Sequence, residues 1–452
     1  MATKEFPLTP QKVPAVNTKY RKICTQIPAP QSVEILETLR RCEPRSMGGQ
    51  PPIIWHSGKD CTISDPYGNT WLDFSAGVLV TASGHGRPEI VKAIAGMAEQ
   101  GLYHAYCFPT IIRAKLAEKI CKFMPKPLAR VFLVTTGSEA TECCIKLART
   151  NGRLINQKKK IIVSFENGFH GRTMGAQLAG GSKGLKGWLD DDPTFVQVPY
   201  PDGFRQTDLS FDVFVNSLER QGIKAEDVAG VIGESYQGCN AAMFPKEYAQ
   251  ALRRWCTENK AVMICDEVQA GFGRTGKPFG FMHWDIVPDL VACGKGISGG
   301  LPLSAVLGTE ELMNIYGPGE MTSTHSANTI CSAAALANIE VIEKEGLIEN
   351  AARLHPILME GCRRVQAASN GKIGHVSGCG LVAAMQFTKP GTTEPDAESA
   401  WKMVKAAYES GLMLFAPVGV GGCCIKVNPP LTINEEALRE GLNVLEDIAA
   451  NV

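Results

Sequence analysis

The sequence predicts an α/β protein, with a large domain built on a mostly parallel sheet and a smaller α+β domain. Six short apolar runs lie between about Val131 and Val306. The segments between them include stretches whose apolar residues recur at helical spacing. Continuous apolar strands that alternate with helices are typical of a parallel sheet covered on both faces.

The predicted elements follow in chain order. The six expected strands are VFLV (131–134), KIIVSF (160–165), VAGVIG (228–233), AVMICD (261–266), DLVAC (289–293) and LSAVLG (303–308). Between them, TECCIKLARTNGRLI and PKEYAQALRRWCTENK have the periodicity of amphipathic helices. After Ser332 a long helical stretch, AAALANIEVIEKEGLIENAARLHPILMEGCRRVQ, leads to a glycine-rich strand region near 378–386. Two further helices are expected around KVNPPLTI.

This change of pattern predicts the domain boundaries. The segment before about Trp71 is too short and irregular to fold alone, so we assign it to the smaller domain. We expect residues 1–75 to belong to the small domain, 76–332 to form the large domain, and 333–452 to form the small C-terminal α+β domain.

Composition excludes several classes of protein. Lys and Arg together number 46, as do Asp and Glu, so the formal net charge is zero and favours neither nucleic acid nor a membrane surface as partner. The N-terminus lacks the apolar stretch of a signal peptide, and no long uncharged apolar run follows, which predicts a cytoplasmic location. The 16 cysteines lack the spacing of a metal site and are expected to be reduced thiols.

The residues that follow each expected strand are candidates for a site, because ligands of open parallel sheets collect at the carboxyl ends of the strands. TTGSEATE (135–142) comes after the first run and before a helix. Small residues at such a turn leave backbone N–H groups available to an anion, with Gly137 and Ser138 as the natural phosphate contacts. Taken alone, an ordinary capped helix start explains this turn as well or better.

Two further strand ends carry chemically useful groups. ENGFHGRT (166–173) offers an aromatic, a histidine and an arginine, which suit a flat ring and an anionic substrate. A glycine turn with a buried Phe and a surface Arg is the simpler alternative. DEVQAGFGRTG (266–276) begins with Asp266, whose carboxylate requires a cationic partner if it is poorly solvated. A pyridinium N–H would serve, and so would the role of a helix N-cap.

The stretch GKGISG (294–299) formally matches a dinucleotide-binding loop. Such a loop opens a long helix, whereas GISGG leads into LPLSAVLG, a strand-like segment that contains proline. A lysine between glycines at a strand end is instead an accessible amine suited to Schiff-base chemistry. Together with the phosphate turn, the aromatic and Asp266, Lys295 completes the set of groups that binds pyridoxal 5′-phosphate.

At this point the sequence resembles the class III pyridoxal-phosphate aminotransferases, especially the 4-aminobutyrate (ω-amino acid) branch. The resemblance extends over nearly the whole chain, from DPYGNTWLDFSAG (65–77) to PPLTI (429–433). Its motifs, in order, are TTGSEATE, GFHGRT, ESYQG, DEVQAGFGRTG, GKGISGGLPLSAV and STHSANT. It implies a fold-type-I transferase whose large domain binds the cofactor.

The resemblance also implies roles for residues near the cofactor ring. Lys295 is expected to form the Schiff base and then to move the proton between the substrate and the cofactor. Asp266 is expected to keep the ring nitrogen protonated. Val268 and Phe169 are expected to sandwich the ring, and Gln269 to bond its phenolic oxygen.

Further residues are implied for the phosphate and the substrate. Gly137 and Ser138 are expected to hold the phosphate together with Thr324 of a neighbouring subunit, which implies a homodimer with shared active sites. Arg172 is expected to bind the donor's carboxylate, and Glu234 to lie near the far side of the cofactor.

Two positions differ from the 4-aminobutyrate branch. There, a glutamate after the Gln-Gly of the strand motif usually pairs with an arginine just before P-P-L-T-I. Here the two positions are Cys239 and Lys426, so we expect the charge-switch gate to be absent or altered. A lysine meets a carboxylate as a point charge rather than as a bidentate fork. Val78 is expected to leave room for substrate on the donor side.

The resulting prediction is an enzyme that transfers an amino group from an amino acid, such as the ω-amino acid 4-aminobutyrate, to a 2-oxo acid by a ping-pong aldimine/ketimine mechanism. A pyridoxal-phosphate-dependent racemase or decarboxylase on the same scaffold is the main alternative. An NAD(P)-dependent oxidoreductase and a catalytically silent cofactor-binding protein are remoter ones. No metal is expected, and the run 190–192 of three aspartates is interpreted as a solvated loop.

Overall fold

A computed structural model describes residues 5–451 of the chain, which divide into two compact units. Pro88–Ala352 form one unit. The described residues up to Arg87, together with those from Arg353 onward, form the other. The domain boundaries inferred from the sequence, after residues 75 and 332, stay predictions. Among the described residues, no helix is long and apolar enough to cross a membrane.

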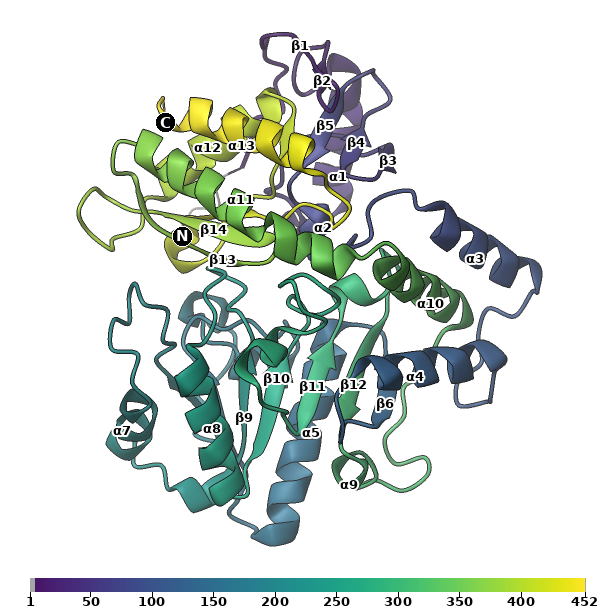
Figure 1. Cartoon of the computed structure of the whole chain (residues 1–452), viewed down its shortest axis with the longest axis vertical. Coiled ribbons are helices and arrows are strands. Elements are labelled where there is room, and N and C mark those ends of the chain that lie inside the picture. Colours follow the sequence, from purple (N-terminus) through teal and green to yellow (C-terminus); the bar gives the residue numbers. More distant parts are fainter. Residues whose placement is uncertain (1–4, 452) are drawn as a thin grey trace. The chain divides into compact units, whose positions relative to one another are not determined.

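The unit Pro88–Ala352 is built on a seven-stranded sheet with the order β6-β12-β11-β10-β9-β7-β8. Figure 1 shows β9, β10, β11, β12 and β6 side by side. The strands are β6 (Arg130–Val134), β7 (Ile161–Phe165), β8 (Phe195–Val198), β9 (Val228–Glu234), β10 (Val262–Asp266), β11 (Leu290–Cys293) and β12 (Ser304–Gly308). All six apolar runs therefore form strands, while β8 was not expected.

One strand of this sheet, β12, runs antiparallel to both of its neighbours. The chain between Cys293 and Ser304 is short and holds only a 3-10 turn, Lys295–Ile297. A parallel return needs a crossover of about a dozen residues or more, usually a helix. Because the connection is short, β12 runs in the opposite direction to β11, and Lys295 stays close to the carboxyl end of β11.

The two amphipathic helices that the sequence predicts between the strands are present, as α5 and α8. They are α3 (Pro88–Glu99), α4 (Ile111–Phe123), α5 (Gly137–Ile155), α6 (Met174–Ala179), α7 (Asp212–Arg220), α8 (Lys246–Glu258), α9 (Glu310–Met313) and α10 (Thr329–Lys344). The long helical stretch expected after Ser332 is two helices, because the chain turns at Gly346, whose φ of 61° lies in the left-handed region that favours glycine.

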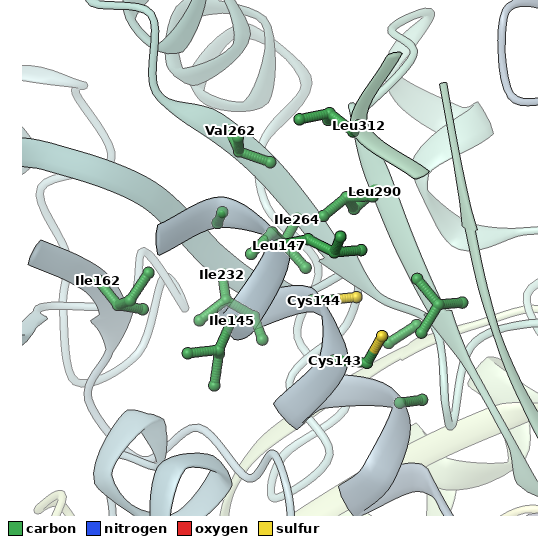
Figure 2. Packing of buried hydrophobic residues seen from close by; sticks show 14 of the residues in the cluster. Cys143, Cys144, Ile145, Leu147, Ile162, Ile232, Val262, Ile264, Leu290 and Leu312 are labelled. Atoms are coloured by element: carbon green, nitrogen blue, oxygen red, sulfur yellow. The ribbon is translucent and has the colours of Figure 1, made fainter. Parts of the chain in front are cut away.

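The core of this unit lies between α5 and the sheet. Figure 2 shows Cys144 and Leu147 of α5 among Ile232, Ile264 and Leu290 of three neighbouring strands. Each of these side chains is at most 1% exposed. Burying a large aliphatic side chain stabilises a fold by about 1.5–3 kcal/mol, so this layer fixes α5 firmly on the strands.

The other unit contains two sheets. In one, the N-terminal strands have the order β1-β2-β5-β4-β3 and β15 pairs with β5; in the other, β13, β14 and β16 form an antiparallel sheet. Its strands are β1 (Val16–Asn17), β2 (Lys22–Ile23), β3 (Ser57–Lys59), β4 (Thr62–Ser64), β5 (Thr70–Asp73), β13 (Ile373–Cys379), β14 (Val382–Phe387), β15 (Leu412–Met413) and β16 (Cys424–Val427). Its helices are α1 (Val33–Cys42), α2 (Ala76–Leu79), α12 (Ala397–Glu409) and α13 (Glu435–Ala449), and α11 (Leu347–Ala368) joins it to the preceding unit.

The short helix α2 has an unusual backbone. All four of its residues have positive φ, from 47° at Ala76 to 65° at Leu79, and one of them is the β-branched Val78 at 63°. A left-handed helical conformation costs roughly 1–2 kcal/mol for each residue that carries a Cβ. Hydrogen bonds around the turn offset this cost: Asp73 accepts from the backbone N–H of Ser75 at 2.7 Å, and Asn428 donates to the carbonyl of Ser75 at 2.6 Å.

Candidate active site

A cavity of about 160 Å³ lies at the carboxyl ends of the strands in the unit Pro88–Ala352. Glu234 and Asp266 are the last residues of β9 and β10, and Lys295 follows β11. The cavity is lined by Thr136, Gly137, Ser138, Phe169, His170, Gly171, Glu234, Asp266, Val268, Gln269 and Lys295. Parallel strands that end at one edge explain how residues from five separate segments meet.

Lys295 lies in a strained and well-anchored turn. Its φ is 42°, in the left-handed region that residues with a Cβ rarely adopt. Asn338 of α10 holds this turn by donating to the carbonyls of Gly296 at 2.9 Å and Ile297 at 3.1 Å. Burial lowers the pKa of the Lys295 amine, although the negative charges of Asp266 and Glu234 act in the opposite direction.

Asp266 is bonded to a histidine on the inner side of the site. His170 Nδ1 lies 2.7 Å from Asp266 Oδ2, and both side chains are almost fully buried. The other carboxylate oxygen accepts from the backbone N–H of Val268 at 3.0 Å. Burial by itself lowers the pKa of His170, but the hydrogen bond and charge of Asp266, with the charge of Glu234, raise it overall. A protonated His170 stabilises the anionic carboxylate of Asp266.

Glu234 is a third buried titratable group beside this pair. Its carboxylate accepts from the backbone N–H of Phe169 at 2.9 Å and of Gly238 at 2.8 Å. Burial raises its pKa to about 7, and the charge of Asp266 adds to this, while His170 lowers it. Glu234 is therefore able to exchange a proton near neutral pH.

The N-terminus of α5 closes one side of the cavity. Thr136 and Glu139 form a capping box, in which the Thr136 hydroxyl accepts from the Glu139 N–H and the Glu139 carboxylate accepts from the Thr136 N–H. The next two N–H groups, of Gly137 and Ser138, have no hydrogen-bond acceptor among residues 5–451. Free N–H groups at a helix N-terminus, beside the Ser138 hydroxyl, bind an anion.

Three sequence-predicted residues of this unit do not line the cavity. Arg172 is exposed, but its guanidinium lies 5.6 Å from the Phe169 ring centre and its N–H donates to the Ser138 hydroxyl at 3.3 Å. Cys239 lies in the turn after β9, where its thiol donates to the Gln237 side chain at 3.3 Å. Thr324 is exposed in a loop.

The remaining two predicted residues belong to the other compact unit. Val78 lies in α2 and is 43% exposed. Lys426 lies in β16 and is only 2% exposed, in register with Ala384 of the neighbouring strand. Their expected roles toward substrate stay predictions.

Sequence reasoning missed functional neighbours of the predicted residues. His170 was noted within GFHGRT but given no role, although it shares a turn with Phe169. A histidine at a strand end, facing an aspartate that ends another strand, was the signal that could have found it. Asn338, which anchors the Lys295 turn, carried no such signal because its position on α10 is far away in sequence.

Comparison with known proteins agrees with this geometry. Residues 45–449 match the model of the family described as aminotransferase class-III. A 4-aminobutyrate aminotransferase from Mycobacterium leprae is 35% identical over 95% of this chain and 98% of its own length. An alanine/serine racemase from Pyrococcus horikoshii is 28% identical over 98% of this chain and 95% of its own. The crystal structure of a Bacillus anthracis aminotransferase has a TM-score of 0.86 at 27% identity, over 93% of this chain and 99% of that one.

The fold and the lysine–aspartate cavity define a fold-type-I enzyme that depends on pyridoxal phosphate. The chain belongs to the class-III aminotransferase family and catalyses transamination between an amino donor and a 2-oxo acid. The predictions of family, fold class and enzyme class are thereby confirmed.

The residues present fit pyridoxal phosphate. The N–H groups of Gly137 and Ser138 offer an anion site, and Asp266 offers a carboxylate whose oxygens have acceptor capacity beyond His170 and Val268. Two positions that line the cavity are too tight for most residues other than glycine. A Cβ at Gly171 would lie 2.3 Å from the Ser138 hydroxyl oxygen, and one at Gly137 would lie 3.0 Å from Val268 Cγ1. The cavity therefore joins a phosphate cradle to a lysine amine and a ring-nitrogen partner.

Proposed function

We propose that this enzyme transfers the amino group of an ω-amino acid, such as 4-aminobutyrate, to a 2-oxo acid. The observation that carries the chemistry is that Lys295, Asp266 and the α5 N-terminus line one cavity. The ω-amino acid is supported by the similarity to a relative described as a 4-aminobutyrate aminotransferase, at 35% identity.

Separate groups of residues would hold the phosphate, the ring and the ring nitrogen of pyridoxal phosphate. When bound, pyridoxal phosphate supplies an aldehyde that condenses with amines and a ring that withdraws electrons from the carbon losing its proton. The N–H groups of Gly137 and Ser138 would hold its phosphate. Val268 and Phe169 would hold its ring from two sides, Gln269 its phenolic oxygen, and Asp266 the protonated ring nitrogen.

Lys295 is proposed to move the proton. Because burial lowers the pKa of its amine, a larger fraction of Nζ is neutral at working pH and able to accept a proton from substrate. The anchored turn at Gly296 and Ile297 fixes the backbone from which the lysine side chain extends. His170 acts at a distance from substrate, through its hydrogen bond to the Asp266 carboxylate.

We propose that the substrate's carboxylates are bound by cations rather than by a switching ion pair. Arg172 would bind the donor's carboxylate, and Lys426 would offer a second cation toward substrate. Replacing Cys239 by Glu and Lys426 by Arg together tests this point. An unchanged acceptor preference would show that these positions do not set it.

A homodimer is part of the proposal. Thr324 is exposed and does not line the cavity of its own chain, so it can reach a phosphate only if a second copy binds. We expect sedimentation to give a dimer, and Thr324→Ala to weaken cofactor retention. A fully active monomer would overturn this part.

The central experiment is spectroscopic. The purified protein should have a visible cofactor band that bleaches when an amino donor is added and returns with a 2-oxo acid. Borohydride should fix the cofactor to Lys295, and Lys295→Ala should lose this labelling. Crossing 4-aminobutyrate, β-alanine, taurine, ornithine and alanine with pyruvate and 2-oxoglutarate then identifies the pair. Bleaching by alanine but by no ω-amino acid would overturn the proposed donor.

The similarity to an alanine/serine racemase supports one second candidate. A racemase keeps every cofactor contact and needs no 2-oxo acid. Chiral analysis of alanine and serine incubated with enzyme alone tests for this activity beside transamination: inversion without a 2-oxo acid supports racemisation, and its absence rules it out for these two amino acids.

A further inference from the structure

A second cavity of about 510 Å³ lies in the unit Pro88–Ala352, and none of its residues lines the active site. One side of it is the flank of α5, and the facing side is α6 with the residues around the start of β8. We call it the α5 groove; it is lined by Glu142, Ile145, Lys146, Arg149, Thr150, Arg153, Met174, Gly175, Leu178, Asp192 and Phe195.

Three cations form a row in the α5 groove. Lys146, Arg149 and Arg153 are three and four residues apart, so their side chains project from one flank of the helix. None of the three has an ion pair within residues 5–451. Like charges at this spacing destabilise a helix by about 0.2–0.5 kcal/mol for each pair, and a bound anion removes that cost.

Arg149 is the middle cation of the row. Its terminal nitrogen donates to the Thr194 side chain and, at 3.3 Å, to the Thr194 carbonyl. Its Nε is buried and has no hydrogen-bond partner in the described part of the chain. A buried guanidinium N–H without an acceptor is costly, so a small shift of the Arg149 side chain toward an anionic oxygen in the groove would relieve that cost.

The two carboxylates that line the groove are already engaged. Glu142 accepts from the Thr173 hydroxyl at 2.7 Å and from the Ala176 N–H at 3.0 Å, which ties α5 to the start of α6. Asp192 accepts from the hydroxyl and N–H of Thr194 at 2.6 and 2.8 Å. The three cations therefore exceed the two acids by one charge.

The facing wall of the groove is apolar. Met174 is 60% exposed there, and Leu178 and Phe195 extend the surface. The Phe195 ring supports Arg149, whose guanidinium lies 4.3 Å from the ring centre. An anion that also carries a carbon body would contact both walls.

We propose that the α5 groove binds an organic phosphate, with the phosphate against Lys146, Arg149 and Arg153 and the carbon body against Met174 and Leu178. Guanidinium and ammonium groups are the usual protein ligands of phosphate oxygens. A volume of 510 Å³ is within the range of about 300–1,000 Å³ typical of small-molecule sites. The site is additional to the transamination cavity.

The test uses the holoenzyme, so that cofactor already occupies the phosphate cradle of the active site. Calorimetric titrations with adenosine monophosphate, inorganic pyrophosphate and adenosine separate the contributions of the phosphate and the carbon body. We expect adenosine monophosphate to bind, pyrophosphate to bind more weakly, and adenosine not to bind. The double variant Lys146→Gln/Arg153→Gln, at two exposed positions, should weaken binding of adenosine monophosphate by about tenfold or more, since it removes two charge-assisted contacts.

The matched control is Lys115→Gln/Lys158→Gln, which removes the same charge at exposed positions outside the groove. It should leave binding within about twofold, because only long-range electrostatics change. Equal weakening by both double variants, or no binding of any phosphate at millimolar concentration, would overturn the site. Binding of pyrophosphate or adenosine as tight as that of adenosine monophosphate would overturn its assignment to an organic phosphate.

Discussion

Each compact unit contains an aspartate–histidine pair with the same separation, fully buried in one unit and partly buried in the other. His170 Nδ1 and Asp266 Oδ2 are 2.7 Å apart in one unit, and His85 Nε2 and Asp73 Oδ2 are 2.7 Å apart in the other. The two pairs differ in what else the carboxylate bonds. Asp266 accepts one further hydrogen bond, from Val268, whereas Asp73 accepts three more, from Ser75 and Ala76.

This difference suggests two functions: the His170–Asp266 pair is suited to binding a ligand, and the His85–Asp73 pair stabilises the local fold. An ionised carboxylate has about four acceptor positions. Asp73 accepts four hydrogen bonds, three from its own turn and one from His85, while Asp266 accepts two and keeps capacity toward the cavity. The same two residue types at the same distance therefore do different things, and the remaining hydrogen bonds decide which.

The largest expected effect is on the open carboxylate. Asp266→Asn should lower the rate of amino transfer by roughly 10²–10⁴-fold, the range for removing an electrostatic partner in an active site. Asn keeps the shape and one acceptor but not the charge. Single-turnover bleaching of the cofactor band by donor measures the rate, and a loss below about tenfold would contradict the role of the charge.

Beside the His170–Asp266 pair the cavity contains a further buried carboxyl group, that of Glu234. Since its pKa is raised to about 7 in the fold, the folded state binds more protons than the unfolded state between about pH 4.5 and 7. Stability from this group is therefore present at low pH and is lost as pH rises through this range, by on the order of 3 kcal/mol. Glu234→Gln should flatten that decline, measured by denaturant unfolding at pH 5 and 7.5; an unchanged difference between the two pH values would refute it.

The histidine of the open pair should matter for activity. His170→Gln keeps a hydrogen-bond donor for Asp266 but removes the positive charge, and should lower the amino-transfer rate by about 10–100-fold, as is usual for the partner of a functional ligand. The melting temperature of the His170→Gln variant should change less than that of a His85→Ala variant. A rate equal to that of the unaltered enzyme would show that the charge of His170 is not needed.

The histidine of the saturated pair should matter for stability. His85→Ala leaves Asp73 without one of its buried partners and should lower the free energy of unfolding by about 1–3 kcal/mol. His56→Ala, at an exposed position nearby in sequence, is the control and should change it by no more than about 0.5 kcal/mol. Equal effects of the two substitutions would mean that the pair does not hold the turn.

The smallest effect is expected in the turn itself. Val78→Gly should stabilise the protein by about 1 kcal/mol or less, because glycine adopts a φ of 63° without strain. The same substitution at Val91, which is exposed in the right-handed helix α3, should instead destabilise by a similar amount. Denaturant unfolding measures both, and the same sign at both positions would contradict the argument.

Much of the fold was predictable because burial leaves a strong pattern. VAGVIG and AVMICD are strands that are buried along their whole length, because they are covered on both faces and carry few polar residues. The edge strand β8 was missed, since it alternates buried and partly exposed residues over only four positions. The break at Gly346 was missed because the apolar pattern continues on both sides of it.

The candidate site was predictable to the extent that its residues follow strands. Eight of the residues expected near the cofactor line the cavity, whereas Thr324 does not. His170 and Asn338 were not assigned roles, because their importance comes from partners 96 and 42 residues away. At Asn338 such separation leaves no local signature, whereas His170 has one weak signal, its place after an expected strand.

The sequence by itself determined the fold class, the family and the lysine–aspartate chemistry. Apolar runs and the residues after them are contiguous in the chain, so they can be recognised without the structure. Only the tertiary structure decided which neighbours the reactive groups have. Whether a carboxylate is saturated, as at Asp73, or open, as at Asp266, depends on hydrogen bonds and burial that exist only once separate segments are packed together.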